Sequence, residues 1–302
     1  MFLFAEEGAH HVPLIVEFVN RYLGEPVYRL QMATTHRWWT AFFAKFGTTP
    51  EEVFGVEYSP ETAIPWYTIM FVIACILSII LIKILRDKLS EDDPSNSQMT
   101  LEAGFLALKN LSENVIGPHA SKYFPVVASF AVLILVSNLM GQFPMFMAPT
   151  ASVNVTFALA ITSFIYYNYV GISENGFINH IAHLTGPRLP LIMTIIITPL
   201  IFSVELISNM IRPFTLGVRL FANMFADEKI FMEITNLAPP FTQFLVPLLL
   251  TGLGVFVAFV QTLVFTLLSM IYISEVTHAP HDHTHGGVHD EHTGEAIATA
   301  HV

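Results

Sequence analysis

The apolar residues of this chain gather in long runs separated by polar segments. Three runs lie at about residues 65–85, 124–144 and 153–171, and two longer ones cover 189–226 and 241–274. A transmembrane helix needs about 20 predominantly apolar residues. The pattern therefore predicts an all-α polytopic membrane protein with five transmembrane helices.

One further segment has helical periodicity but is too polar to cross a membrane. Its apolar residues recur at helical spacing, whereas charged and amide side chains occupy the positions between them. Gly117 and Pro118 follow and predict its end. We expect an amphipathic helix that lies on the membrane surface. The apolar positions are Leu101, Phe105, Leu108, Leu111 and Val115.

The last two runs are too long for upright spans. A helix over the 34 residues 241–274 would measure about 51 Å, whereas the hydrocarbon core of a bilayer is about 30 Å thick. Such a helix must tilt steeply or project beyond the bilayer. We therefore expect a long tilted hairpin, with bends at Pro199 and Pro213 and a turn at Pro239 and Pro240.

Positive charges after the first apolar run predict the orientation of the chain in the membrane, and the polar segments at both ends predict its division into regions. Lys83, Arg86 and Lys88 close the first span, and positive charges mark the cytoplasmic side. The N-terminus is therefore predicted outside and the C-terminus in the cytoplasm. Three regions are expected: an extracytoplasmic N-terminal region (1–63), a membrane domain (64–275) and a histidine-rich, disordered cytoplasmic tail (276–302).

Composition supports a membrane protein and excludes some other classes. The 302 residues are 53% hydrophobic and only 12% charged, about half the charged fraction of soluble domains. The net charge of −11 and the lack of a basic cluster argue against nucleic-acid binding. A single cysteine, Cys75, permits no disulfide within the chain.

Arg219 stands in the middle of the fourth apolar run, where an arginine facing lipid costs several kcal/mol. Glu205 lies fourteen residues before it and Glu228 nine residues after it, or about 21 Å and 14 Å along a helix. Such residues usually face a bundle interior or a wet cavity and serve ion movement. Two structural alternatives remain open: Arg219 pairs with one of the acids as a staple, or its side chain reaches the interface.

The spacing of the polar residues around Arg219 indicates which of them share a helix face. Glu205, Arg212 and Arg219 recur every seven residues, so they lie on nearly one face. Asn223 follows Arg219 by four residues and shares its face. We expect Asn223 to hydrogen-bond across to a partner helix.

These residues belong to a motif that resembles a known family. The segment LGVRLFANMFADE (216–228), with Glu205 upstream and Gln261 downstream, is similar to subunit a of the F-type ATP synthase. The segments SNLMGQFP (137–144) and PTASVNVT (149–156) resemble that family as well. The resemblance covers roughly residues 60–275.

The resemblance implies a non-catalytic stator in the bacterial plasma membrane. It would pass protons to and from a rotating ring of c subunits and would contact the peripheral-stalk b subunits and lipid, with no cofactor. Two offset half-channels would each reach the middle of the membrane, with Arg219 between them. The resemblance implies an inlet lined by Glu228, Asn223 and Gln261, and an outlet lined by Glu205, Ser208 and Asn209.

The chain departs from the family pattern at one position. Seven residues before Gln261, many family members carry a histidine or an acid opposite the counterpart of Glu228, but this chain has Gly254. Asp227, directly before Glu228, is expected to compensate and to share the inlet role.

Two other classes of function are considered beside the stator. An ion-coupled secondary transporter could use Arg219 as a substrate or ion site, although that class usually shows internal repeats and none is evident here. A purely structural anchor would not explain why polar residues stand within the apolar runs; these residues are Glu205, Arg219, Glu228 and Gln261. The histidines of the tail could bind a metal by composition alone, and no specific metal site is predicted.

Overall fold

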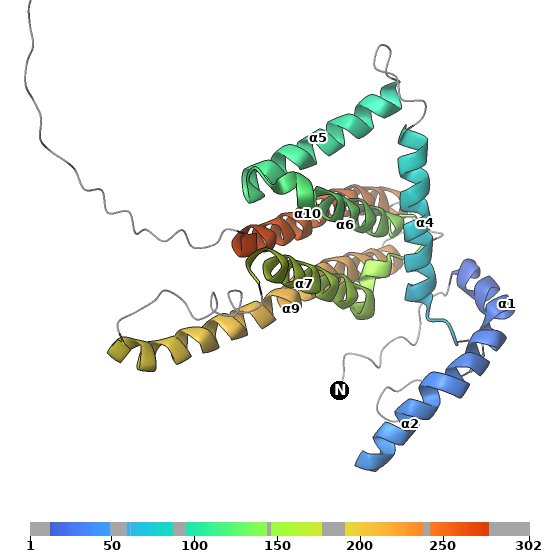
Figure 1. Cartoon of the computed structure of the whole chain (residues 1–302). Helices are drawn as coiled ribbons and strands as arrows, with labels where there is room; N and C mark the ends of the chain where they lie inside the picture. The colour runs from blue at the N-terminus through green and yellow to red at the C-terminus, as the bar shows by residue number, and fades with distance from the viewer. Residues whose placement is uncertain are drawn as a thin grey trace, which may run out of the picture.

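The computed structural model of the chain is helical throughout the part that it describes (Figure 1). The expected turn at Pro239 and Pro240 and the histidine-rich tail lie outside that part. The described residues are 13–48, 59–60, 62–86, 95–143, 146–176, 191–237 and 242–277.

The described part of the chain begins with a helical rod beside the bundle (Figure 1). It comprises α1 (Leu14–Gln31), a π-helical turn η1 (Met32–His36), α2 (Arg37–Phe43) and a 3-10 turn η2 (Ala44–Phe46). Two side chains of α1 tie this rod to the segment before the first apolar helix. The side-chain amide of Asn20 exchanges hydrogen bonds of 3.0 and 3.1 Å with the backbone of Ile64, and Gln31 Nε2 donates to Ala63 O at 3.0 Å.

The first apolar helices agree closely with the ranges expected from the sequence. They are α4 (Trp66–Arg86), α6 (Ala120–Met140) and α7 (Val153–Asn175). Helix α6 ends earlier than residue 144 because the chain turns sharply at Gly141, where a Cβ would lie 2.8 Å from the Cβ of Ala148. A short 3-10 turn, η3 (Pro149–Ala151), then leads into α7.

The expected amphipathic helix is α5 (Asn96–Ile116), which packs against α4, α6 and α10. It begins earlier than the apolar pattern indicated because Ser95 Oγ accepts a hydrogen bond from Gln98 N at 3.3 Å and caps the helix. It ends at Gly117, whose φ of 91° few other residues adopt.

Two long helices complete the bundle. Helix α9 (Leu191–Leu237) has 47 residues and passes through Pro199 and Pro213 as one helix, and α10 (Thr242–Thr277) has 36. At 1.5 Å per residue they measure about 70 and 54 Å. Figure 1 shows them beside α6 and α7, running across α4 rather than parallel to it.

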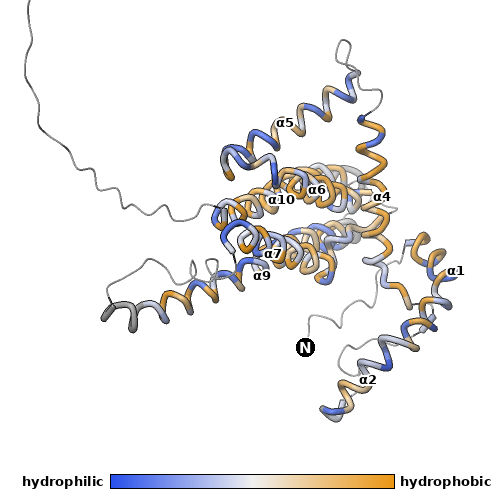
Figure 2. Tube along the Cα trace, viewed as in Figure 1, coloured by the Kyte–Doolittle hydropathy of each residue, from blue (hydrophilic) through white to orange (hydrophobic). Residues whose placement is uncertain are grey.

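Four helices of the described chain are long and apolar enough to cross a membrane. They are α4, α6, α7 and the segment Leu248–Thr277 of α10. Figure 2 shows apolar residues over most of α4, where Val72, Ile76, Ile80 and Ile84 are exposed. An apolar surface on such helices is expected where a protein faces lipid rather than water.

Helix α10 forms the centre of the bundle, because it packs against α5, α6, α7 and α9. Gly217 of α9 lets that helix approach α7 closely, since a Cβ there would lie 3.4 Å from side-chain atoms of Phe157 and Ala160. Buried apolar side chains from α6, α7, α9 and α10 meet in one cluster, which includes Ile134, Leu159, Leu216, Leu220, Met224 and Phe265.

Two polar residues of the α6–α7 hairpin behave differently from one another. Asn138 is fully buried, and its Oδ1 accepts a 2.7 Å hydrogen bond from Thr150 Oγ1, so this amide has a structural role. Asn154 is exposed. Three tyrosines near the end of an apolar run, here Tyr166, Tyr167 and Tyr169, predict an aromatic belt at the membrane interface. This prediction is wrong for Tyr167, which is only 2% exposed and donates a hydrogen bond to Asn209 of α9.

Candidate functional site

Polar side chains lie at three successive levels along the antiparallel pair of α9 and α10. The first level, the Arg212 cluster, consists of Glu205, Asn209, Arg212, Tyr272, Glu275 and Tyr167 of α7. The second, the Arg219 layer, consists of Arg219, Asn223 and Gln261. The third, the Asp227 cluster, consists of Asp227, Glu228, Gly254 and Gln142 of the turn after α6.

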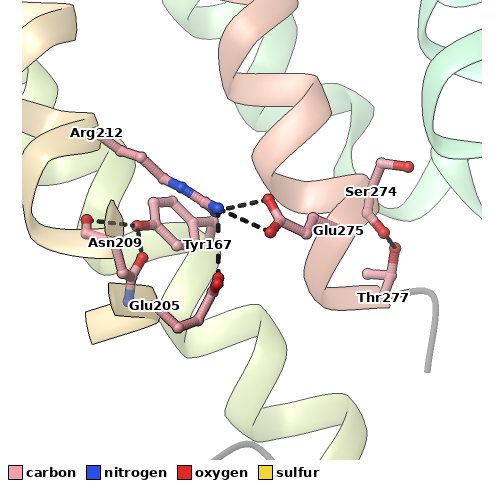
Figure 3. Close-up of polar contacts among 7 residues, drawn as sticks. All are labelled: Tyr167, Glu205, Asn209, Arg212, Ser274, Glu275 and Thr277. Carbon is pink, nitrogen blue, oxygen red and sulfur yellow. Dashed lines mark hydrogen bonds and ion pairs between the residues drawn. The ribbon is translucent and has the colours of Figure 1, made fainter. Parts of the chain in front are cut away.

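Arg212 holds two carboxylates from different helices (Figure 3). Its Nη1 and Nη2 donate to the two oxygens of Glu275 at 2.6 and 2.8 Å, whereas its Nη2 lies 3.7 Å from Glu205 Oε1. The bidentate contact is the stronger kind of arginine–carboxylate pairing. Glu275 is therefore held firmly, while Glu205, about two turns before Arg212 in α9 and 37% exposed, is held loosely.

Two tyrosines enclose the guanidinium group of Arg212. The ring of Tyr272 lies 5.2 Å from Arg212 Cζ, within cation–π distance. Tyr167 packs against Tyr272 with ring centroids 5.6 Å apart, and its hydroxyl donates to Asn209 Oδ1. Ser208, the residue before Asn209 in α9, is half-buried at the same level. The outlet residues expected from the sequence thus lie around one ion-paired arginine.

Arg219 differs from Arg212 in making no hydrogen bond or ion pair with the described residues. It is exposed. Asn223 Nδ2 donates to Gln261 Oε1 at 2.7 Å, so the predicted contact of Asn223 with a neighbouring helix is confirmed. Gln261 is 2% exposed, and its Nε2 has no hydrogen-bond partner in the described part of the chain.

The Asp227 cluster lies at the other end of the shared α9–α10 surface. Gln142 Nε2 donates to Asp227 Oδ2 at 2.9 Å, and both side chains are half-buried. Gly254 of α10 is buried directly against them, because a Cβ there would lie 2.5 to 2.7 Å from their polar atoms. Glu228 is also half-buried and follows Asp227 in α9.

Packed apolar side chains separate the two charged clusters. Leu216, Leu220 and Met224 of α9 and Phe265 of α10 are each at most 3% exposed. Arg212 and Arg219 are about 10 Å apart along the helix axis, and Arg219 and Asp227 about 12 Å. Among the described residues, no printed hydrogen bond or ion pair joins the Arg212 cluster directly to the Asp227 cluster.

Comparison with known proteins agrees with this arrangement. The family model described as ATP synthase A chain matches residues 67–274. The chain belongs to this family. The resemblance that rests on the segment LGVRLFANMFADE is therefore confirmed. The chain is a multi-pass membrane protein and a member of the ATP synthase complex.

Curated relatives cover most of the A chain. ATP synthase subunit a of Solibacter usitatus is 38% identical over 221 residues, which is 72% of this chain and 90% of the relative. The proteins of the same name from Geobacter sulfurreducens and Trichlorobacter lovleyi are 38% and 36% identical. Those matches cover 67% and 77% of this chain, and 82% and 94% of the relatives.

Three residues of the A chain lie at the site although the sequence did not indicate them. Glu275 was grouped with the end of the membrane domain, yet it follows Gln261 by fourteen residues and Gly254 by twenty-one, so the three share a face of α10. That spacing could have identified it. Gln142 lies in the family-like motif SNLMGQFP, but no spacing links Gln142 to Asp227 or Tyr167 to Asn209, because these contacts depend on how separate helices pack.

Proposed function

We propose that this A chain is the proton-conducting stator of an F-type ATP synthase in a bacterial plasma membrane. It takes no part in the chemistry of ATP by itself. Its partners are the ring of c subunits, the peripheral-stalk b subunits and the lipid bilayer. Protons pass through two offset half-channels, and their transfer to and from the ring couples proton flow to rotation and ATP synthesis.

The observation that carries this proposal is that Arg219 is exposed and makes no hydrogen bond or ion pair within the described part of the chain. Arg219 is exposed, whereas its α9 neighbours Leu216 and Leu220 are buried, so its side chain is accessible from outside the bundle on an apolar helix. An arginine directed at lipid is costly, which favours a protein partner with a negative charge at that depth. A carboxylate on a neighbouring ring supplies that charge, and the fixed cation favours its deprotonated form.

The two charged clusters supply the ends of the half-channels. Asp227 and Glu228, with Asn223 and Gln261 deeper in, form the inlet from outside. Glu205, Ser208 and Asn209 form the outlet to the cytoplasm. Arg219, together with the buried apolar residues between the clusters, keeps these paths apart, so that a proton crosses the middle of the membrane only on the ring.

This function requires a defined topology. We propose that α4, α6, α7, α9 and α10 form five spans, that α5 lies on the cytoplasmic interface, and that the N-terminal region lies outside. Helices α9 and α10 exceed the bilayer thickness by about 40 and 24 Å, which supports the steep tilt of a hairpin against the side of the ring.

Cysteine labelling tests this topology. We expect Ser274→Cys, in a Cys75→Ser background, to react with a membrane-impermeant maleimide only from the cytoplasmic side. Thr34→Cys in the exposed part of η1 is the matched control and should react only from outside. Labelling of Ser274→Cys from outside would contradict the proposed orientation.

Purification of the native complex tests the function itself. The A chain should co-purify with a ring of c subunits, and proteoliposomes containing the complex should acidify on addition of ATP. Failure of c subunits to co-purify, together with substrate-dependent uptake by the isolated chain, would instead indicate an ion-coupled transporter.

A further inference from the structure

The space beside Gly254 is filled from two other segments. A Cβ at position 254 would lie 2.5 and 2.6 Å from the amide atoms of Gln142 and 2.7 Å from Asp227 Oδ2. These separations are shorter than any normal contact. The volume that a side chain on α10 would occupy is therefore taken by one amide and one carboxylate.

The amide and the carboxylate are bonded to each other. Gln142 Nε2 donates to Asp227 Oδ2 at 2.9 Å across 85 residues of sequence. A hydrogen bond to an ionised carboxylate is about twice as strong as one between neutral groups. Asp227 makes no other hydrogen bond among the described residues, so its second oxygen is available to take a proton.

The turn that carries Gln142 is fixed on both sides. Its backbone N–H donates to Leu139 O at 3.0 Å, and Gly141 lies tightly against Ala148. Asn138 and Thr150, both fully buried, are joined by a 2.7 Å hydrogen bond across the same turn. The motifs SNLMGQFP and PTASVNVT thus hold the start of the Gln142 side chain in place.

We infer that Gln142 is a positioning residue of the inlet half-channel, which holds the Asp227 carboxylate in the space opened by Gly254. This inference rests on the proposed function. Gln142 supplies the polar partner that α10 lacks at position 254. Because its amide is neutral, Gln142 neither gains nor loses a proton. Asp227 takes a proton from a hydronium ion on its second oxygen, which leaves water behind, and passes that proton inward.

Proton pumping by the assembled complex in inverted vesicles tests the inference. Gln142→Met keeps the length of the side chain and removes the donor, and we expect the rate of ATP-driven acidification to fall about tenfold or more. Asp227→Asn should have a similar effect. If Gln142 acts through Asp227, Gln142→Met should cause no further loss in the Asp227→Asn background.

A double variant in which the amide and the carboxylate exchange places, the swapped pair, distinguishes a positioning role of Gln142 from a role in packing alone. Gln142→Glu combined with Asp227→Asn restores an amide–carboxylate pair with the two groups exchanged, and it should recover part of the rate lost in Asp227→Asn. Gln98→Met is the matched control, because Gln98 Nε2 also donates to a carboxylate, Glu102 Oε1 at 2.6 Å, but in α5. This control should pump at the wild-type rate.

Three results would overturn the inference: wild-type pumping by Gln142→Met, equal losses from Gln142→Met with and without Asp227→Asn, or no recovery in the swapped pair. If Gln142→Met fails to assemble with c subunits, the swapped pair alone decides. None of these results concerns Arg219, so normal pumping by Arg219→Ala would separately mark failure of the proposed function.

Discussion

Arg219→Ala is expected to abolish ATP-driven acidification of inverted vesicles while leaving the complex assembled. Because Arg219 makes no hydrogen bond or ion pair within the described chain, its removal breaks no such bond there. What is lost is the counter-charge of the ring carboxylate, which then keeps its proton as it passes. Recovery of c subunits with the variant, measured beside acidification, distinguishes loss of function from loss of assembly.

Arg219→Lys extends this prediction. Lysine keeps a positive charge but lacks the planar fork of donors, and it can lose its proton when desolvated. We therefore expect Arg219→Lys to fail in coupled ATP synthesis as well. Arg29→Ala is the control, because Arg29 and its partner Glu25 are 77% and 56% exposed and lie in α1. Normal pumping by Arg219→Ala would show that this arginine has only a structural role.

Arg212→Ala is expected to destabilise the complex more than Arg219→Ala but to reduce pumping less. Its removal leaves Glu205 and Glu275 close together without their shared cation. Breaking a buried pair costs about 3–5 kcal/mol, and since both carboxylates are more than a third exposed we expect roughly 1–3 kcal/mol here. The thermal midpoint for release of the A chain from the complex measures this loss.

A second variant identifies the cause of that destabilisation. Arg212→Leu combined with Glu275→Leu removes the bidentate pair without leaving Glu275 uncompensated, so it should be more stable than Arg212→Ala. A thermal midpoint of Arg212→Ala equal to that of the Arg29→Ala control would contradict the role assigned to the Arg212 cluster.

Much of the helical framework follows from local sequence. The ranges of α4 and α7 agree with the apolar runs, because about 20 apolar residues bounded by polar ones have few alternatives to a span. The spacing predicts that Asn223 bonds to a partner helix, and in the structure its Nδ2 donates to Gln261 Oε1 of α10 at 2.7 Å. The helix ends were less predictable, since α5 depends on the cap at Ser95 and α6 on the close approach of Gly141 to Ala148.

The partners across helices could not be read from spacing alone. Arg212 and Glu275 are 63 residues apart and Gln142 and Asp227 are 85 apart, so each contact depends on the register of packed helices. Tyr167 illustrates the same limit, because its position near the end of an apolar run is typical of a membrane-interface tyrosine. Close approach of α7 to α9 at Gly217 instead turns it towards Asn209.

Passive proton leak with the ring held still tests most directly whether Arg219 separates two half-channels. Vesicles carry the intact complex, the catalytic head is inhibited so that the ring cannot turn, and the decay of an imposed pH gradient is followed. Wild-type vesicles should retain the gradient. Arg219→Ala vesicles should lose it, and addition of Glu205→Gln, which removes the outlet acid, should restore retention. Retention of the gradient by Arg219→Ala as well as by wild type would contradict the separation of two half-channels by this arginine.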